Sequence, residues 1–131
     1  MAGDNDLLVD GKQVDYIFFP GEPLVVSHGK YCFENRTSKI KVCTINSCHF
    51  LINENAVPIH VFSIYTGDRL IDKVLPIPPA SRLEIRVTIP FTEVRIGFKF
   101  TYGVRLNLEC DGIQYDVTSN LNIIQEKTYT D

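Results

Sequence analysis

The chain has 131 residues, of which 44% are hydrophobic and 22% are charged, and its formal net charge is −3 at pH 7. This length and composition predict one globular domain, over residues 1–131, that buries a core without needing a metal or a disulfide. The charge is mildly acidic and no block of like charges occurs, so we expect no nucleic-acid partner and no binding to an anionic membrane.

Signal-peptide and membrane-span patterns indicate where a protein is expected to reside. The first residues lack the basic stretch and long apolar run of a signal peptide. No apolar run approaches the ~20 residues of a membrane-spanning helix. We therefore expect an intracellular, cytoplasmic protein without membrane insertion, in which the sequon Asn35-Arg36-Thr37 stays unmodified. Residues 1–5 and 126–131 are expected to be flexible.

Strand patterns begin near the N-terminus. Asp10-Gly11 predicts a hairpin turn, because both residue types are common in tight turns. Residues 13–19 then alternate as a strand, and the prolines and glycine of 20–23 predict the turn that ends it.

The middle of the chain continues with strands and turns. Segments 38–45 and 57–66 are β-rich and apolar on both faces, which is typical of central strands. The prolines of 77–81 predict an extended loop. The segment after this loop alternates strictly and predicts a half-buried strand. Its expected core face holds Leu83, Ile85, Val87 and Ile89.

The longest alternation covers residues 94–110, where every even position is apolar. At ~3.3 Å per residue it is too long for one strand of a small domain, so we expect a break at Gly103 and strands at 92–101 and 104–110. Asp111-Gly112 then predicts a type I′ hairpin. That turn pairs Cys110 with Ile113, Leu108 with Tyr115 and Leu106 with Val117, all apolar.

The overall pattern indicates an all-β protein. No stretch of ten residues has clear helical periodicity, and short strands follow one another with turns between them. We predict an antiparallel β-sandwich of about 7–9 strands, with a jelly roll as the alternative.

Cysteine and histidine residues supply the candidate metal or nucleophile chemistry. Cys43, Cys48 and His49 form a C-x4-C-H cluster, but this spacing matches no common zinc motif. No nucleophile elbow and no phosphate-binding loop occur. We expect reduced, buried cysteines, no catalytic residue, no metal and no cofactor, and keep a small metal-binding or Cys/His enzyme as an alternative. Further candidate ligands are Cys32, Cys110, His28 and His60.

Segments 40–47, 77–89 and 108–117 together resemble the immunoglobulin-like domains of the major sperm protein, PapD and ASH group. In that group a β-rich strand leads to an Asn-containing turn, a Pro-rich stretch precedes an alternating strand, and a late hairpin closes the sandwich. The resemblance covers residues 30–124. It implies an immunoglobulin-like fold and a non-enzymatic adaptor or self-assembling protein, and it identifies no binding residue.

We therefore expect a non-enzymatic module that binds a protein partner, or itself, through a sheet edge or a loop patch. The expected edges are the hairpin at Asp10-Gly11 and the strand that follows Asp111-Gly112. A self-assembling structural subunit of a capsid or filament is the alternative. The candidate partner-binding residues are Phe18, Phe19, Ile77, Pro78, Pro79, Gln114 and Tyr115.

Overall fold

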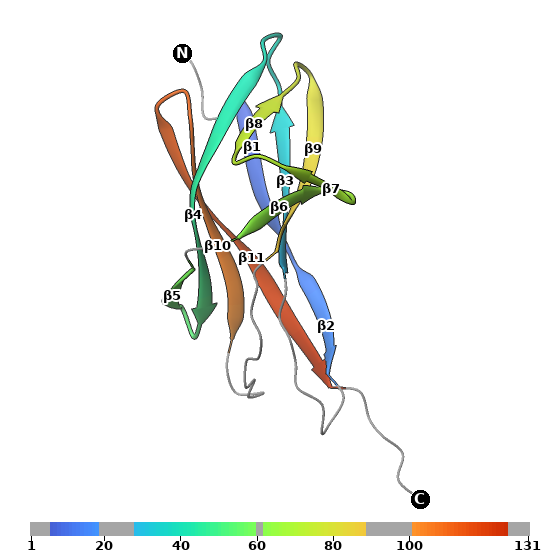
Figure 1. The fold of residues 1–131 in the computed structure, drawn as a ribbon, viewed down its shortest axis with the longest axis vertical. Helices are drawn as coiled ribbons and strands as arrows, with labels where there is room; N and C mark the ends of the chain where they lie inside the picture. The colour runs from blue at the N-terminus through green and yellow to red at the C-terminus, as the bar shows by residue number, and fades with distance from the viewer. Residues whose placement is uncertain (1–5, 19–27, 60–61, 89–100, 126–131) are drawn as a thin grey trace, which may run out of the picture.

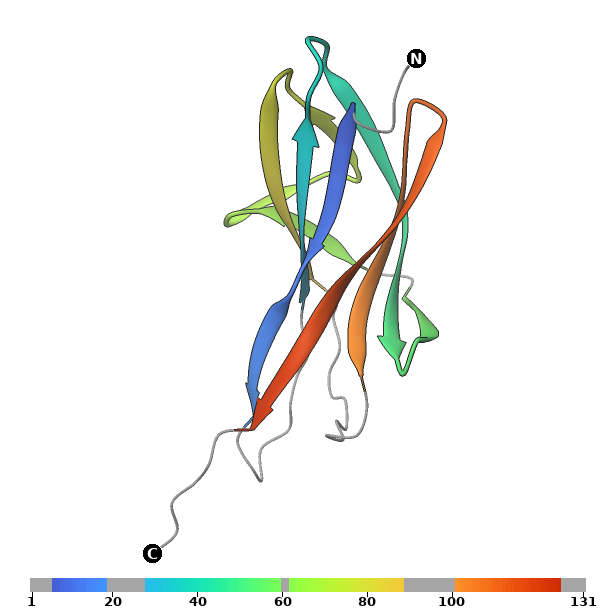
Figure 2. The same cartoon turned by 180° about the vertical axis from the view of Figure 1, so that it is seen from behind.

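The computed structural model describes residues 6–18, 28–59, 62–88 and 101–125, and these form two β-sheets packed face to face (Figure 1 and, from behind, Figure 2). Among the described residues, no helix is long and apolar enough to cross a membrane. The first sheet has the spatial order β1 (Leu7–Lys12), β3 (His28–Asn35), β9 (Ser81–Thr88), β6 (Ser63–Thr66) and β7 (Arg69–Ile71). The second has the order β2 (Val14–Phe18), β11 (Ile113–Gln125), β10 (Tyr102–Cys110), β4 (Lys41–Ile52) and β5 (Asn55–Ile59), and β8 (Val74–Ile77) also pairs with β4.

The predicted all-β sandwich is confirmed, with two differences in detail. The described chain contains eleven strands rather than about 7–9, because segment 57–66 contributes to both β5 and β6, and the residues between it and β9 form two short strands, β7 and β8. The pairing is antiparallel except between β2 and β11, which run parallel. The parallel pair arises because the chain passes from β1 in the first sheet to β2 in the second with one residue between them.

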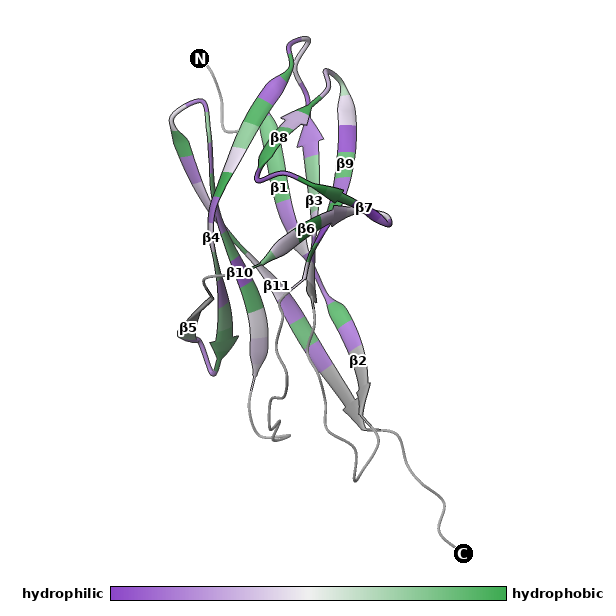
Figure 3. Cartoon of the chain, viewed as in Figure 1, coloured by the Kyte–Doolittle hydropathy of each residue, from purple (hydrophilic) through white to green (hydrophobic). Residues whose placement is uncertain are grey.

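The core lies between the sheets and is filled from both. Tyr31 and Phe33 enter it from β3, Phe50 from β4 and Leu106 from β10, and each side chain is at most 1% exposed. The Tyr31 hydroxyl donates a hydrogen bond to the Val104 carbonyl, so this buried polar atom links the two sheets without an unpaired group. Hydrophobic and hydrophilic bands alternate along strands such as β4 (Figure 3), as period-two burial requires.

β4 keeps its core face because it contains a bulge. Cys43 and Ile45 are buried, but the next buried residues are Cys48 and Phe50. The buried positions thus change from odd-numbered to even-numbered residues between the two pairs. The pairing with β10 shifts at the same place, which leaves Asn46 without an opposite residue. A bulge inserts one extra residue and rotates the following side chains to the other face. The bulge explains why both odd-numbered and even-numbered positions of this strand carry apolar core residues.

The predicted hairpin at Asp111-Gly112 is confirmed. Both turn residues have positive φ, 51° and 79°, as a type I′ turn requires. The three predicted apolar pairs occur in the observed register, with Cys110 opposite Ile113 and the other two pairs following. Turn chemistry and burial pattern therefore specify the same register.

The predicted hairpin at Asp10-Gly11 is wrong. Both residues lie inside β1, which pairs with β3 along its whole length. β1 is nevertheless the terminal strand of the first sheet, so the edge expected at this place is present. A Cβ added to Gly11 would lie 2.0 Å from the carbonyl oxygen of Thr118 in β11. Glycine is needed here because two backbones cross, and not because the chain turns.

The predicted break at Gly103 is also wrong, for a similar reason. Gly103 lies within β10, opposite Asn120 of β11 and Leu51 of β4. A Cβ at this position would approach the carbonyl oxygen of Ser119 to 3.3 Å. The glycine permits a close approach between strands. Of the strand predicted at 92–101, all but Thr101 falls outside the described residues.

Asn35 ties together one end of the sandwich and is only 1% exposed. Its Nδ2 group donates to the carbonyl oxygens of Lys39, Ile77 and Pro78 at 2.8–3.1 Å. Its Oδ1 atom accepts hydrogen bonds from the N–H and the hydroxyl of Thr37 at 3.0 and 2.7 Å. The asparagine of the sequon is therefore a buried structural residue that a glycan cannot reach in the folded chain.

Candidate functional site

The outer edge of β11 next to its hairpin lacks a neighbouring strand. β11 pairs with β10 over residues 113–121 and with β2 only over residues 121–125. Within the described residues, no strand pairs with 113–120 on the side away from β10. Figure 2 shows the hairpin tip standing apart from the start of β1, whereas β11 and β2 run together at the other end. We call residues 113–117 the hairpin edge.

The register shows which backbone groups face outward from the hairpin edge. The N–H and C=O of one strand residue lie on the same side, and successive residues alternate. The Thr118 carbonyl faces Gly11 of β1 and thus points away from β10. In a two-residue hairpin the residues that flank the turn, here Cys110 and Ile113, hydrogen-bond to each other. Ile113 therefore faces β10, and the alternation again directs the next residue outward. Gln114 and Asp116 therefore present outward backbone N–H and C=O groups.

Apolar side chains line the hairpin edge on the face that points toward the other sheet. Ile113 is 44% exposed although its strand partner Cys110 is buried. Tyr115 and Val117 are half-buried and pack against the core. Their partial exposure follows from the position of β11, because a strand with a neighbour on one side only leaves its inner face partly uncovered. The hairpin edge thus combines outward backbone groups with an apolar row.

A pocket of about 120 Å³ lies between the hairpin and the start of β1. Its lining includes Leu7 of β1, Cys110 of β10 and Tyr115 of β11. Lys41 and Asp111, which also line it, form an ion pair of 2.7 Å, and this hydrogen bond raises the pKa of Lys41. The pocket therefore joins an apolar interior to a polar margin next to the hairpin edge.

Ser119 marks the place where the hairpin edge ends. Its side chain is fully buried, and its hydroxyl donates to the Lys12 carbonyl and accepts from the Lys30 N–H at 3.1 Å. Together with the contact of Gly11 on Thr118, these bonds tie β1, β3 and β11 at one point. No sequence pattern marks Ser119, because its role depends on three strands that are distant along the chain.

Two of the predicted partner-binding residues lie on the hairpin edge. Gln114 is exposed and Tyr115 is half-buried, and they follow the predicted turn directly. The strand after Asp111-Gly112 was expected to form an edge, and the first half of β11 does so within the described residues.

The predicted loop patch is only partly at the surface. Ile77 is 0% exposed, because it alternates with Leu75 on the core side of β8, so its side chain cannot contribute to a surface patch. Pro78 and Pro79 are exposed in the turn before β9. Phe18 ends β2 and pairs with β11 through its backbone, and Phe19 lies outside the described residues.

Segment 38–45 contributes to a central strand, as predicted, because β4 pairs with β10 and with β8, but its outer face is not covered. Ile40 is 56% exposed and Val42 is 45% exposed. Val42 faces Pro76 of β8, and Val74 on the same strand is 52% exposed. These residues form an apolar patch on the outer face of the second sheet, next to β8. Pro76 of β8 has no backbone N–H, which limits further pairing of that strand.

Cys43, Cys48 and His49 do not converge on one point. Both cysteines face the core from β4, and His49 lies on the opposite face, with its Nε2 atom 3.4 Å from the Ser47 hydroxyl. No group of three or more His, Cys, Asp or Glu side chains in the described residues is arranged to hold a metal ion. His60 lies outside the described residues.

The core thiols are in a poor setting for nucleophilic chemistry. Burial raises the pKa of Cys48 to about 12, and it also raises the pKa values of Cys43 and Cys110, which face each other across β4 and β10. The reactive form of cysteine is the thiolate, which a raised pKa disfavours. The predicted free, buried thiols are observed at all four cysteines.

No protein-family model matches the chain, and no curated protein matches it in sequence. Solved structures match it in fold. PapD-like domain 7 of human CEP192, an ASH/PapD-like domain, has a TM-score of 0.53 and 10% identity, covering 93% of this chain and 87% of that one. A family 123 glycoside hydrolase from Clostridium perfringens has a TM-score of 0.55 and 11% identity, covering 92% of this chain. The periplasmic chaperone SfaE has a TM-score of 0.45 and 11% identity, covering 94% of this chain and 59% of that one.

The match to the ASH/PapD-like domain spans nearly all of both chains and shows the fold. The predicted immunoglobulin-like sandwich of the PapD and ASH type is thereby confirmed. This chain spans only 28% of the length of the glycoside hydrolase, so the likeness there concerns one part of that enzyme. At identities of 10% and 11%, these similarities show the architecture alone.

Proposed function

We propose that this protein is a non-enzymatic interaction module that binds a protein partner by adding a strand at the hairpin edge. The observation that carries the proposal is the open stretch 113–117, where Gln114 and Asp116 direct backbone groups outward beside a half-exposed apolar row. An extended segment of a partner gains affinity from backbone hydrogen bonds and specificity from side-chain pockets in this mode.

The hairpin edge is one of the two least protected edges of the described sheets, and β2 is the other. Proteins protect free edges with proline, with charged side chains or by keeping the strand short. β8 contains Pro76, β5 contains Pro58, and β7 has three residues and begins at Arg69. The hairpin edge contains no proline and no basic residue, and Asp116 is its single charge. β2 likewise has no proline and no basic residue, with Asp15 as its single charge, so what distinguishes the hairpin edge is the apolar row and the pocket beside it.

The pocket beside the hairpin edge supports the same mode. A strand added to β11 would alternate its side chains, as every strand does, and those on the inner side would lie over Tyr115 and toward Leu7. The pocket of about 120 Å³ is large enough for one small apolar side chain and not for a whole drug-sized ligand. A peptide that places one apolar residue there fits better than a free small molecule.

Replacing Gln114 with proline tests strand addition, because proline removes the outward N–H and its ring blocks an approaching strand. We expect Gln114→Pro to weaken partner association at least about tenfold while the circular dichroism spectrum stays that of the wild type. The matched control is Gln114→Ala, which removes the side chain and keeps the N–H. The measurement is retention of partners, or of the protein itself, on immobilised wild-type and variant chains.

The control separates strand addition from side-chain recognition. Equal retention by wild type and Gln114→Pro contradicts the proposal, and so does equal loss by the proline and alanine variants. Light scattering over a hundredfold concentration range identifies the partner as a second copy if the mass rises and Gln114→Pro abolishes the rise. A rise that Gln114→Pro leaves unchanged would favour the structural-subunit alternative through another surface.

A further inference from the structure

A row of basic side chains crosses the outer face of the first sheet, on the opposite side of the sandwich from the outer face of β4. Lys12 of β1 faces Lys30 of β3, Lys30 faces Arg86 of β9, and Arg86 faces Tyr65 of β6. Neighbouring strands lie ~4.8 Å apart, so the three cationic side chains begin within ~10 Å of one another. We call Lys12, Lys30 and Arg86 the basic row.

The basic row lines a pocket of about 190 Å³. Tyr31 and Ile85 form part of its floor, although their side chains are buried among the core residues. Gly67, in the turn between β6 and β7, lines it without a side chain, and nothing lies within 4 Å of the place where a Cβ would be. Pockets for drug-sized ligands hold ~300–1,000 Å³, so this one suits a single small group.

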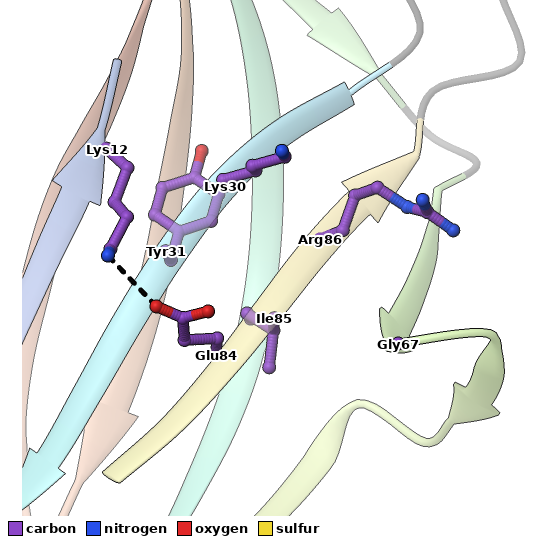
Figure 4. Close-up of a pocket in the computed structure, with 7 residues that line it drawn as sticks. All are labelled: Lys12, Lys30, Tyr31, Gly67, Glu84, Ile85 and Arg86. Atoms are coloured by element: carbon purple, nitrogen blue, oxygen red, sulfur yellow. Dashed lines mark ion pairs between the residues drawn. The ribbon is translucent and has the colours of Figure 1, made fainter. Parts of the chain in front are cut away.

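The charges in the pocket are unbalanced. Glu84 pairs with Lys12 at 2.9 Å, which raises the pKa of Lys12 and lowers the pKa of Glu84. Figure 4 shows Lys12 reaching toward Glu84, while Lys30 and Arg86 extend from β3 and β9 away from this ion pair. Lys30 forms no ion pair with any residue that the structure describes. Three cations and one carboxylate leave a local charge of +2 on a chain of net charge −3.

Arg86 is held in place and has an unused donor. Its guanidinium carbon lies 5.2 Å from the centre of the Tyr65 ring, a cation–π contact that favours this position of the side chain. Its Nε atom is buried and has no hydrogen-bond partner among the described residues. Buried donors in proteins are nearly always paired with protein, water or an ion. This unpaired donor can reach a ligand only if the Arg86 side chain shifts, because the Nε atom has almost no exposed surface.

We propose that the basic row binds the phosphate group of a phosphate monoester. A phosphate monoester carries close to two negative charges near neutral pH, which matches the local charge of +2, whereas a carboxylate carries one. The planar guanidinium of Arg86 matches two phosphate oxygens, and the Lys30 ammonium supplies a point charge to a third. This site is independent of the hairpin edge and stands or falls apart from the proposed function.

The test is a titration of the protein with inorganic phosphate at constant ionic strength, followed by amide chemical shifts. We expect saturable shifts in β3, β9 and the Gly67 turn, and none at the hairpin edge. Lys30→Gln and Arg86→Gln should each weaken binding about tenfold, the usual effect of losing a charge-assisted hydrogen bond. Lys39→Gln, at an exposed lysine outside the pocket, is the matched control and should leave the affinity unchanged.

A variant that is expected to bind phosphate more tightly tests whether loss of folding explains the weaker binding of the other variants. Glu84→Gln removes the carboxylate that competes for Lys12, so it should tighten phosphate binding. Shifts that stay linear with concentration, shifts that chloride reproduces, or equal affinities for Arg86→Gln and Lys39→Gln would overturn the proposal.

The source of the phosphate is decided by comparing two monoesters at the same site. If glycerol 3-phosphate binds as tightly as a peptide that carries phosphoserine, the ligand is a small molecule. If the peptide binds more tightly and the Arg86→Gln variant loses that gain, the ligand is a phosphorylated segment of a protein. Both results support the phosphate site, and failure of both ligands to bind contradicts it.

Discussion

Gly11→Ala is expected to destabilise the protein by about 3 kcal/mol or more, because the new methyl group would meet backbone atoms and not flexible side chains. Its carbon would lie 2.0 Å from the Thr118 carbonyl oxygen and 2.5 Å from the Thr118 carbonyl carbon. Relief requires β1 to move away from β11, which also breaks the hydrogen bond of Ser119 to Lys12. Urea unfolding monitored by circular dichroism measures the loss.

Gly67→Ala is the matched control for this substitution. Gly67 has positive φ but open space around its Cβ position, so alanine there should cost only the backbone term of about 1 kcal/mol. A similar loss for both variants would contradict the close crossing of β1 and β11, which sets the point where the hairpin edge ends.

Asn35→Asp is expected to destabilise the protein strongly at pH 7, by more than the about 3 kcal/mol expected for Asn35→Ala. The alanine variant leaves buried partners unsatisfied. The aspartate variant also places a carboxylate against the three carbonyl oxygens that now accept from Nδ2. An ionised carboxylate cannot donate to them, and burial opposes its charge.

The pH dependence of Asn35→Asp has a defined sign. The carbonyl oxygens and burial raise the pKa of the introduced carboxyl in the folded state above its unfolded value of ~3.9. Its stability relative to the wild type is therefore highest below pH ~4 and falls by ~1.4 kcal/mol per pH unit up to the folded pKa. Asn120→Ala, at an exposed asparagine of β11, should be nearly neutral. A difference from the wild type that stays constant between pH 4 and pH 7 would contradict this role for Asn35.

Local patterns predicted the parts of the fold that depend on neighbouring residues. The hairpin at Asp111-Gly112 and its register follow from turn chemistry and alternation within one segment. Gln114 and Tyr115 were identified with it, because the strand after a hairpin turn is often at an edge. The predictions at Gly11 and Gly103 are wrong, because a glycine needed for close approach to a distant strand looks the same in the sequence as a glycine in a turn.

The features that distant strands create had no local signal. Lys12, Lys30 and Arg86 are separated by 18 and 56 residues, and only the order of β1, β3 and β9 aligns them. Ser119 and Asn35 are polar residues whose burial depends on backbone groups from other strands. Charge counts along the sequence therefore indicated no basic surface, although the folded sheet has one.

The most direct test of the central claim is amide hydrogen exchange along the first half of β11 in the free protein. An open hairpin edge predicts fast exchange at Gln114 and Asp116, whose N–H groups face outward, and slow exchange at Tyr115 and Val117, whose N–H groups face β10. Slow exchange at all four residues would show that the edge is already paired and would contradict strand addition as the mode of binding.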